Sequence, residues 1–237
     1  MNAHAAVDRK AEIAERLAAV RRRISDACEA AGRDPAEITL IAVTKTFPAA
    51  DVRLLADLSV TDIGENRDQE AAPKAAACAD LPLTWHFVGQ LQTNKARSVV
   101  TYAGVVHSVD RVRLVTSLSR EAVRAGRTPR CLVQVTLDDD PSRGGARPSE
   151  VPALAAQIAA APGLDLAGVM AVAPLGADPG RAFAVLADVA AALRAEHPEA
   201  DIISAGMSDD LEPAIACGAT HLRVGTALLG GRRAIVR

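Results

Sequence analysis

The sequence predicts an α/β protein folded as a single (β/α)8 TIM barrel with an extra helix at its N-terminus. Three observations lead to this prediction. Short apolar stretches typical of buried parallel strands alternate with amphipathic helical stretches, and about eight such pairs follow one another. The length of 237 residues is close to the usual size of about 250 residues for this fold. No segment rich in proline, glycine or serine divides the chain, so we expect one domain over residues 1–237.

The first predicted element is a helix that precedes the barrel. Apolar residues such as Ile13, Leu17 and Ile24 recur at helical spacing over residues 7–31, and Gly32 ends this pattern. The barrel should then occupy residues 38–237. Its strands are predicted at 38–45, 61–65, 85–89, 104–109, 131–137, 164–172, 201–206 and 221–226, and its helices at 50–58, 69–79, from Thr93, at 111–125, 149–161, 180–196 and 209–217.

An open, doubly wound sheet is the alternative architecture for such an alternation. That fold usually carries a G-x-G-x-x-G turn after its first strand, where a dinucleotide phosphate binds. The sequence after residues 38–45 reads TFPAADVR and contains no glycine. The barrel is therefore the favoured prediction.

Composition and charge exclude several classes of function. The chain has 27 basic and 29 acidic residues, whereas broad nucleic-acid binding requires a concentrated basic face. No apolar run has the length of a membrane span, and the N-terminus lacks a signal pattern. The four cysteines form no CxxC pair and the five histidines show no metal spacing. We expect a cytoplasmic monomer without a metal, a nucleic-acid partner or a membrane partner.

The stretch IAVTKTFP places a single lysine, Lys45, at the end of the first predicted strand. A lysine removed from water there loses proton affinity and becomes a neutral nucleophile that can form a Schiff base with an aldehyde. The alternative is that Lys45 is only the first solvated residue of the following loop.

The loops after the seventh and eighth strands have the composition of a phosphate site. In a barrel these two loops commonly bind phosphate, and here they carry glycines and hydroxyl groups, notably Ser208, Gly225 and Thr226. These residues also have a purely structural interpretation. Ser208 is placed to cap the next helix, a role compatible with phosphate binding, and Gly225 with Thr226 is placed to form a tight turn.

Arg223 is a permanent cation inside an apolar strand, where a buried charge needs a partner. Strand alternation allows Arg223 and Lys45 to point into the same barrel mouth. A salt bridge to Glu65 or Asp62 is the structural alternative. A lysine, an arginine and a phosphate site around one mouth suggest a phosphorylated aldehyde, of which pyridoxal 5′-phosphate (PLP) is the common cofactor.

Several strings resemble the YggS/PROSC family of PLP homeostasis proteins. They are IAVTKTFP, IGENRDQEAAPK, WHFVGQLQTNK, VHSVDR, GVMAV and ISAGMSDDLEPAIACGATHLRVGTALLGGR, and together they cover nearly the whole chain. The resemblance implies the barrel of alanine racemase, which is PLP fold type III, without the second β-domain of that enzyme.

The resemblance also implies roles for individual residues. Lys45 would be the Schiff-base lysine, Asn66 a neighbour of the cofactor ring and Arg223 the partner of the pyridine nitrogen. The other cofactor-binding residues would be Met170, Ser208, Gly225 and Thr226.

The function implied by the family is intracellular vitamin B6 homeostasis, with PLP held on Lys45 and little or no catalysis. Arg223 would keep the pyridine nitrogen unprotonated, which weakens the ring as an electron sink. Tyr102, the only tyrosine, is predicted away from the mouth and so cannot serve as a second base. Apo-enzymes that require PLP are the implied partners. The alternatives are a PLP-dependent amino-acid racemase or lyase, and a Schiff-base aldolase acting on a sugar phosphate.

The chain departs from the family pattern at three places. Arg67 and Asp68 follow GEN where many members have Tyr-Val, Gln90 replaces a proline found in some members, and Ser142–Gly145 differs from a KSG string. These positions lie beside the cofactor motifs. We expect them to affect contacts with substrates or partners rather than cofactor binding.

Overall fold

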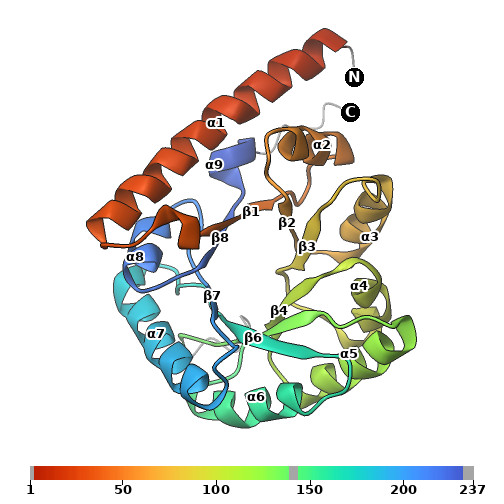
Figure 1. Ribbon diagram of the computed structural model, residues 1–237, viewed down its shortest axis with the longest axis vertical. Coiled ribbons are helices and arrows are strands. Elements are labelled where there is room, and N and C mark those ends of the chain that lie inside the picture. Colours follow the sequence, from red (N-terminus) through yellow and green to blue (C-terminus); the bar gives the residue numbers. More distant parts are fainter. Residues whose placement is uncertain (1–2, 139–143, 232–237) are drawn as a thin grey trace.

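The computed structural model describes residues 3–138 and 144–231 and shows a closed barrel of eight parallel strands (Figure 1). The strands follow one another around the barrel in chain order. They are β1 (Thr39–Val43), β2 (Asp62–Glu65), β3 (Thr84–Phe87), β4 (Val105–Val109), β5 (Arg130–Gln134), β6 (Asp165–Met170), β7 (Ile202–Ser204) and β8 (His221–Val224). The predicted fold class is confirmed, and every predicted strand is present at or within its expected range, to within one residue.

Helices surround the barrel as predicted, with one addition. They are α1 (Ala3–Ala30), α2 (Ala49–Asp57), α3 (Asp68–Ala77), α4 (Ala96–Tyr102), α5 (Val112–Ala125), α6 (Val151–Ala159), α7 (Pro179–Glu196), α8 (Leu211–Ala216) and α9 (Thr226–Leu229), with short 3-10 turns at Pro35–Glu37, Thr93–Lys95 and Pro148–Glu150. The eighth strand was expected to reach Thr226, but it ends at Val224. Gly225 instead accepts the amides of Leu228 and Leu229 and begins the short helix α9.

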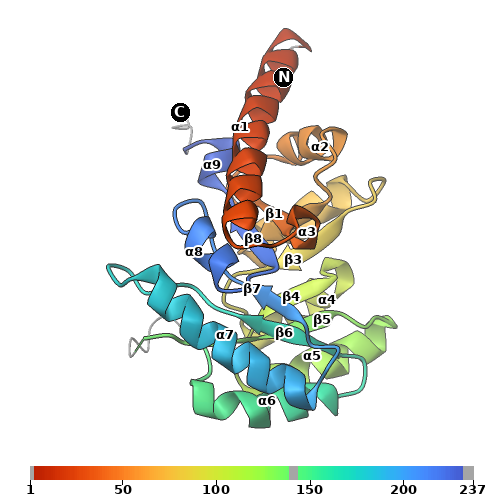
Figure 2. The same cartoon turned by 60° about the vertical axis from the view of Figure 1, so that its left-hand side comes forward.

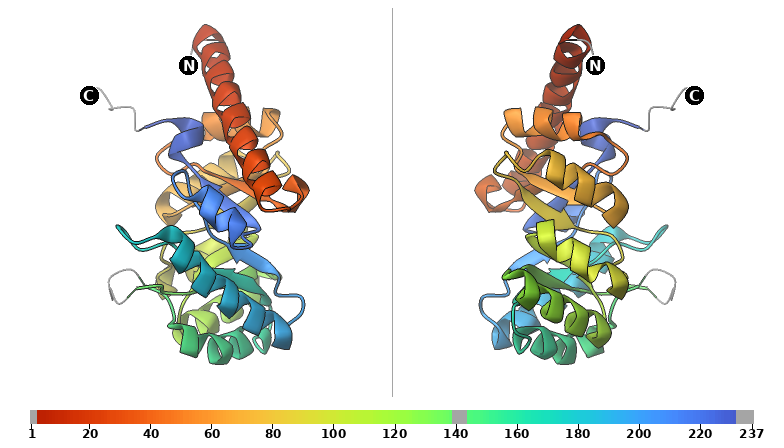
Figure 3. Two further views of the ribbon diagram at one scale, coloured as in Figure 1. Left: turned by 90° about the vertical axis from the view of Figure 1, so that its left-hand side faces the viewer. Right: turned by 90° about the vertical axis from the view of Figure 1, so that its right-hand side faces the viewer.

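The extra N-terminal helix α1 lies along the β8–β1 side of the barrel, against α8 and α9 (Figures 1 and 2). Ile13, Leu17 and Val20 are buried on the face that it turns to the barrel. Its N-terminal end projects beyond the barrel (Figure 3). Near that end the buried Arg9 binds the Asp51 carboxylate of α2 at 2.8 Å and the carbonyl of Leu229 at 3.0 Å. Burial of an apolar face together with this ion pair fixes α1 to the barrel.

The main hydrophobic core lies between the strands and the surrounding helices. It is largely aliphatic, as the 2% aromatic content requires, and its largest fully buried residues include Phe87, Leu114, Leu118 and Ile158. No helix in the described part of the chain combines the length and the apolarity needed to cross a membrane.

The interior of the barrel is partly polar. A small apolar cluster of Val105, Leu132, Ala167, Met170 and Ile202 fills one part of it. His86, His107, Ser204 and Arg223 are also buried, and hydrogen bonds join them across the interior. The side chains that carry chemistry therefore lie inside the barrel and at its mouth.

Candidate functional site

The carboxyl ends of β7, β8, β1 and β2 form one continuous side of the barrel mouth, because these strands are neighbours in the closed sheet. Val43 pairs with Gly64 of β2, and Lys45 and Asn66 each lie two residues further along their own strand ends. On the other side of β1, a Cβ atom placed on Gly225 would lie 3.3 Å from the Val43 carbonyl oxygen. This backbone packing brings the predicted site residues of four loops to one side of the mouth.

Lys45 is exposed and lies in a turn two residues beyond the end of β1. The turn is fixed on both sides, since the Phe47 amide donates to the Thr44 carbonyl at 3.0 Å and the Thr46 amide donates to Glu70 at 3.0 Å. The Lys45 amine has no partner among the described residues. The expectation of a desolvated lysine is therefore wrong, because β1 ends at Val43 and the turn carries the lysine out of the core.

A buried charged group lies directly beneath this turn. The Lys74 ammonium donates to Glu65 Oε1 and, at 2.8 Å, to the carbonyl of Thr44. The Thr44 hydroxyl also donates to Glu65 Oε1, at 2.5 Å. Both side chains of the ion pair are buried, and Glu65 Oε2 has no hydrogen-bond partner within the described chain. This group anchors the residue that precedes Lys45.

Asn66 is half-buried at the end of β2, and its side-chain amide has no partner among the residues described. Gly89, in the loop after β3, packs directly on its backbone. A Cβ atom at position 89 would lie 2.2 Å from the Asn66 carbonyl oxygen, which is far inside van der Waals contact. Only glycine fits at position 89, because the Asn66 backbone leaves no room there for a side chain.

The predicted phosphate loops are joined by a hydrogen bond from the Ala227 amide to the Ser208 hydroxyl oxygen, at 3.2 Å. Thr226 is exposed, and neither its hydroxyl nor its amide has a partner in the described chain. Ser208 is not the cap of α8, so that interpretation is wrong; Asp210 occupies the cap position and accepts the Met207 amide at 2.6 Å. The two loops present unpaired donors at the N-terminus of α9.

Arg223 is 5% exposed and has no carboxylate partner among the residues described. Its Nη1 donates to the Ser204 hydroxyl at 2.6 Å and its Nη2 donates to the Ala171 carbonyl at 2.8 Å, while Nε has no partner in the described chain. Burial lowers the pKa of Arg223 to about 10, so it remains charged at neutral pH.

The alternative interpretation, a salt bridge from Arg223 to Glu65 or Asp62, is wrong, because each of these carboxylates has another partner. Glu65 binds Lys74, and Asp62 lies 2.9 Å from His86. Arg223 is instead held by neutral oxygens and keeps its charge uncompensated by a direct ion pair.

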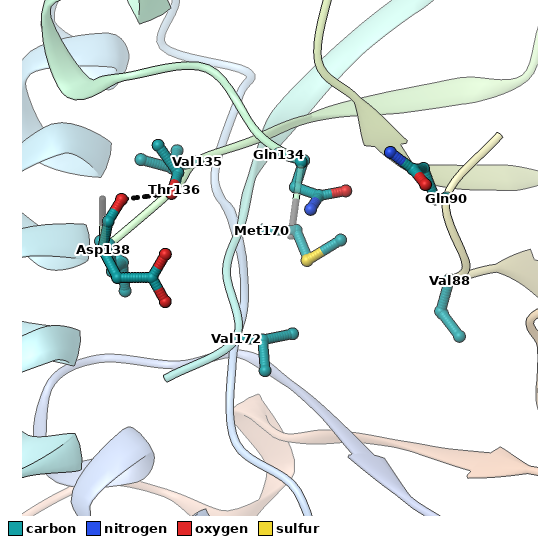
Figure 4. A pocket seen from close by; sticks show the side chains of 10 residues that line it. Val88, Gln90, Gln134, Val135, Thr136, Asp138, Met170 and Val172 are labelled. Atoms are coloured by element: carbon teal, nitrogen blue, oxygen red, sulfur yellow. Dashed lines mark hydrogen bonds between the residues drawn. The ribbon is translucent and has the colours of Figure 1, made fainter. Parts of the chain in front are cut away.

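Met170 is 2% exposed at the end of β6 and lines a cavity of about 240 Å³ on the other side of the mouth (Figure 4). Val88 and Gln90 form one wall and Val172 lies beside Met170. The remaining lining residues are Gln134, Val135, Thr136, Leu137, Asp138 and Gly144. Of the predicted cofactor residues, Met170 is the only one that lines this cavity; it lies between the cavity and the barrel interior.

Two histidines are functional candidates that the sequence analysis did not select. His86 in WHF and His107 in VHSV are buried in the middle of β3 and β4, and their rings lie 2.9 Å apart from Nδ1 of His86 to Nε2 of His107. The signal was a polar residue at an inward-facing position of an apolar strand. The search for metal spacing along the sequence did not detect it. No group of three or more potential metal ligands occurs in the described part of the chain.

Tyr102 is the last residue of α4, and its hydroxyl contacts Asp68 of α3 at 3.4 Å. Burial and the nearby Asp68 carboxylate raise the pKa of this phenol well above its ordinary value. Arg67 is exposed beside this contact, and Gln90 lines the cavity next to Met170. Ser142 and Arg143 lie outside the described residues, whereas Gly144 borders the cavity.

Comparison with known proteins gives a consistent family. The profile of the family described as "Alanine racemase, N-terminal domain" matches residues 16–233. A protein of Mycobacterium tuberculosis named pyridoxal phosphate homeostasis protein is 46% identical over 245 residues, covering 95% of each chain. An Escherichia coli protein of the same name is 39% identical and covers 93% of this chain and 97% of its own.

Solved structures agree with this result. The structure of PipY from Synechococcus elongatus with PLP bound superposes with a TM-score of 0.81 at 39% identity, covering 92% of this chain and all of PipY. An alanine racemase of Clostridium difficile shares the fold alone, with a TM-score of 0.65, 14% identity and 60% of its own length covered. The chain therefore belongs to the alanine racemase N-terminal domain family and, within it, to the pyridoxal phosphate homeostasis proteins.

Proposed function

We propose that this protein binds PLP at the β7–β8–β1–β2 side of the barrel mouth, holds it through a Schiff base on Lys45 and serves PLP homeostasis. One observation carries the proposal. Lys45, Arg223, the loop with Ser208 and the loop with Thr226 come from strand ends on one side of the same barrel mouth. The name shared by the M. tuberculosis and E. coli relatives and the PLP bound to PipY support it.

The donor groups of this chain fit the cofactor. The Thr226 hydroxyl and amide are donors without a partner among the described residues and suit a phosphate, and the Ser208 hydroxyl and Gly225 lie beside them. The Lys45 amine and the Asn66 amide are also unpaired in the described chain, and Arg223 Nε has an N–H left to donate. Met170 offers an apolar contact at the inner edge.

We expect little catalysis from this arrangement. PLP supplies an electron sink for carbanions, and its strength depends on protonation of the pyridine nitrogen. Arg223 stays charged at neutral pH and donates hydrogen bonds, so it would not supply a proton to that nitrogen. Tyr102 is occupied with Asp68 and does not serve as a second proton carrier in the mouth. Apo-enzymes that require PLP are the proposed recipients.

The first test of this proposal is a spectrum of the purified protein. We expect a yellow protein, and borohydride reduction followed by peptide mapping should place the label on Lys45. Lys74 and Lys95 are internal controls, since Lys74 is buried in the ion pair with Glu65 and Lys95 lies 3.8 Å from Asp68. Label on either control would remove Lys45 from this role. A colourless protein that takes up no added PLP would favour an aldolase acting on a sugar phosphate.

The second test separates a carrier from an enzyme. The loaded protein is incubated with alanine in heavy water, and the exchange of the α-hydrogen is followed by NMR. We expect exchange near background for the native protein and an increase in Arg223→Glu, whose carboxylate would favour a protonated pyridine nitrogen. Racemisation or exchange by the native protein at enzyme-like turnover would establish a PLP-dependent racemase instead.

A further inference from the structure

A line of hydrogen-bonded side chains crosses the barrel interior. We call Asp62, His86, His107, Ser204 and Arg223 the interior relay. His86 Nε2 lies 2.9 Å from Asp62 Oδ1, and His86 Nδ1 lies 2.9 Å from His107 Nε2. His107 Nδ1 lies 2.9 Å from the Ser204 hydroxyl oxygen, which accepts a hydrogen bond of 2.6 Å from Arg223. The relay joins β2, β3 and β4 to β7 and β8, which lie across the barrel from β4.

The two ends of the interior relay determine the direction of every hydrogen bond between them. Arginine only donates and an ionised carboxylate only accepts. Ser204 accepts from Arg223 and donates to His107 Nδ1. His107 therefore carries its hydrogen on Nε2 and donates to His86 Nδ1, and His86 carries its hydrogen on Nε2 and donates to Asp62. Both histidines are neutral in this arrangement, and every hydrogen in the line has an acceptor.

The opposite direction of these hydrogen bonds is disfavoured, because it leaves one hydrogen of the relay without an acceptor. If His107 donated from Nδ1 to Ser204, then His86 would have to donate from both nitrogens and become a cation. The Ser204 hydrogen would then have no acceptor among the described residues, since His107 and Arg223 are its only partners there. A buried polar hydrogen without an acceptor destabilises the arrangement that contains it.

Burial reinforces this arrangement. His107 and Ser204 are fully buried, and His86 and Arg223 are nearly so. Burial holds the pKa of His107 well below its usual range, and the Arg223 cation acts in the same direction. Burial alone would raise the pKa of Asp62, but the interactions with His86, Thr61 and His221 together outweigh burial, and the pKa lies below its ordinary value. Asp62 is thus a carboxylate at neutral pH, as the direction of the relay requires.

We propose that the interior relay positions the Arg223 guanidinium, and that Arg223 is its only cation. Asp62, His86, His107 and Ser204 are positioning residues, since they act through Arg223. The inference rests on the function proposed above, in which Arg223 faces the pyridine nitrogen of bound PLP. With Nη1 and Nη2 fixed on Ser204 and Ala171, the unpaired Nε–H of Arg223 keeps one direction in the mouth.

The first experiment reads the relay in the cofactor-free protein, independently of PLP. Long-range ¹H–¹⁵N NMR of the imidazole rings, assigned with single histidine variants, should show His86 and His107 neutral with the hydrogen on Nε2 at neutral pH. Asp62→Asn keeps an acceptor and should leave this pattern unchanged, whereas Asp62→Leu should change the tautomer or protonation state of His86. An imidazolium or an Nδ1–H tautomer at either ring in the wild type would overturn the proposal.

The second experiment compares two buried serines. Ser204→Ala cuts the relay next to Arg223, while Ser108→Ala removes a buried hydroxyl that has no partner in the described chain. In cofactor-free protein, the Arg223 guanidinium should show separate, slowly exchanging NMR signals in the wild type and in Ser108→Ala, and averaged signals in Ser204→Ala. Separate signals that persist in Ser204→Ala would show that the relay does not position Arg223.

The third experiment measures PLP affinity by titration. We expect Ser204→Ala to raise the dissociation constant about tenfold and Ser108→Ala to change it less than about twofold. In an Arg223→Met background, Ser204→Ala should have no further effect. An equal loss in both backgrounds would overturn the proposal. Wild-type protein that binds no PLP would refute the proposed function instead, and the two NMR experiments would still decide on the relay.

Discussion

The layer between helices and strands and the interior of the barrel are built from different kinds of residue. The outer layer is a continuous aliphatic cluster contributed by the helices and by one face of the strands. The interior holds a small apolar cluster beside the histidines and Arg223 of the interior relay. Apolar burial dominates folding stability, whereas buried polar groups are costly unless fully paired. The comparison indicates that stability resides mainly in the outer layer, and it agrees with the proposal that the interior polar groups position Arg223.

The outer layer should give the largest loss of stability. Phe183 of α7 is 2% exposed, and Phe183→Ala should lower the free energy of unfolding by about 3–5 kcal/mol, because it leaves a cavity in a packed layer. Urea denaturation measures this value. Val185→Ala on the same helix, at a position 46% exposed, is the control and should change stability by less than about 0.5 kcal/mol. PLP affinity should stay the same in both variants under folding conditions.

A substitution at the mouth should weaken PLP binding and leave the stability of the fold nearly unchanged. Thr226→Ala should weaken PLP binding by about 1.5–3 kcal/mol, the value of hydrogen bonds to a charged group, with little change in unfolding free energy. Titration of the cofactor-free protein provides the measurement. Thr116→Ala, an exposed threonine on α5, is the control. Equal affinity in the two variants would mean that Thr226 only helps to form the turn into α9.

The interior should make stability depend on pH. Burial lowers the pKa of His221 from 6.5 to about 4, and its charged or titratable neighbours are His86, Arg130, Asp62 and Asp201. Between these pKa values the unfolded chain binds a proton that the folded chain does not bind. The stability is therefore complete above about pH 6.5 and falls by roughly 1–3 kcal/mol as the pH drops toward 4. His221→Gln should flatten this dependence in denaturation at several pH values, with His107 leaving a residual slope in the same direction.

Loss of the Arg223 cation should change stability only slightly. Arg223→Met removes a buried cation that has no carboxylate partner in the described chain, and the saved desolvation should offset the lost hydrogen bonds to within about 1 kcal/mol. Arg9→Met is the contrast, since it leaves Asp51 buried without its cation and should cost about 3–5 kcal/mol. A large loss of stability in Arg223→Met would place Arg223 among the residues kept for folding.

The sequence was sufficient to predict the fold, whereas the roles of the residues at the mouth remain predictions. Apolar strands alternating with amphipathic helices predict a barrel directly, and the barrel places strand ends such as Lys45 and Arg223 at one mouth. Two local features were not predictable from pattern. The helix α9 is too short to show periodicity, and the exposure of Lys45 depends on β1 ending two residues earlier than expected.

The interior relay could not be predicted from the sequence and is apparent only in the closed barrel. Ser204 and His107 are 97 residues apart in the chain, and β7 is not a neighbour of β4 in the sheet. Only the closure of the barrel brings them within hydrogen-bond distance. In the sequence, each of these residues is only a polar residue within an apolar strand. Its hydrogen-bond partner cannot be deduced from spacing along the sequence.

The exposure of Lys45 has a consequence for the rate of cofactor exchange. A lysine in contact with water lets hydrolysis of its bond to an aldehyde proceed without prior opening of the protein. The residence time of the cofactor would then depend on the phosphate and ring contacts and on the chemistry of that bond. Under the proposed function, release of PLP would then require no opening of the barrel.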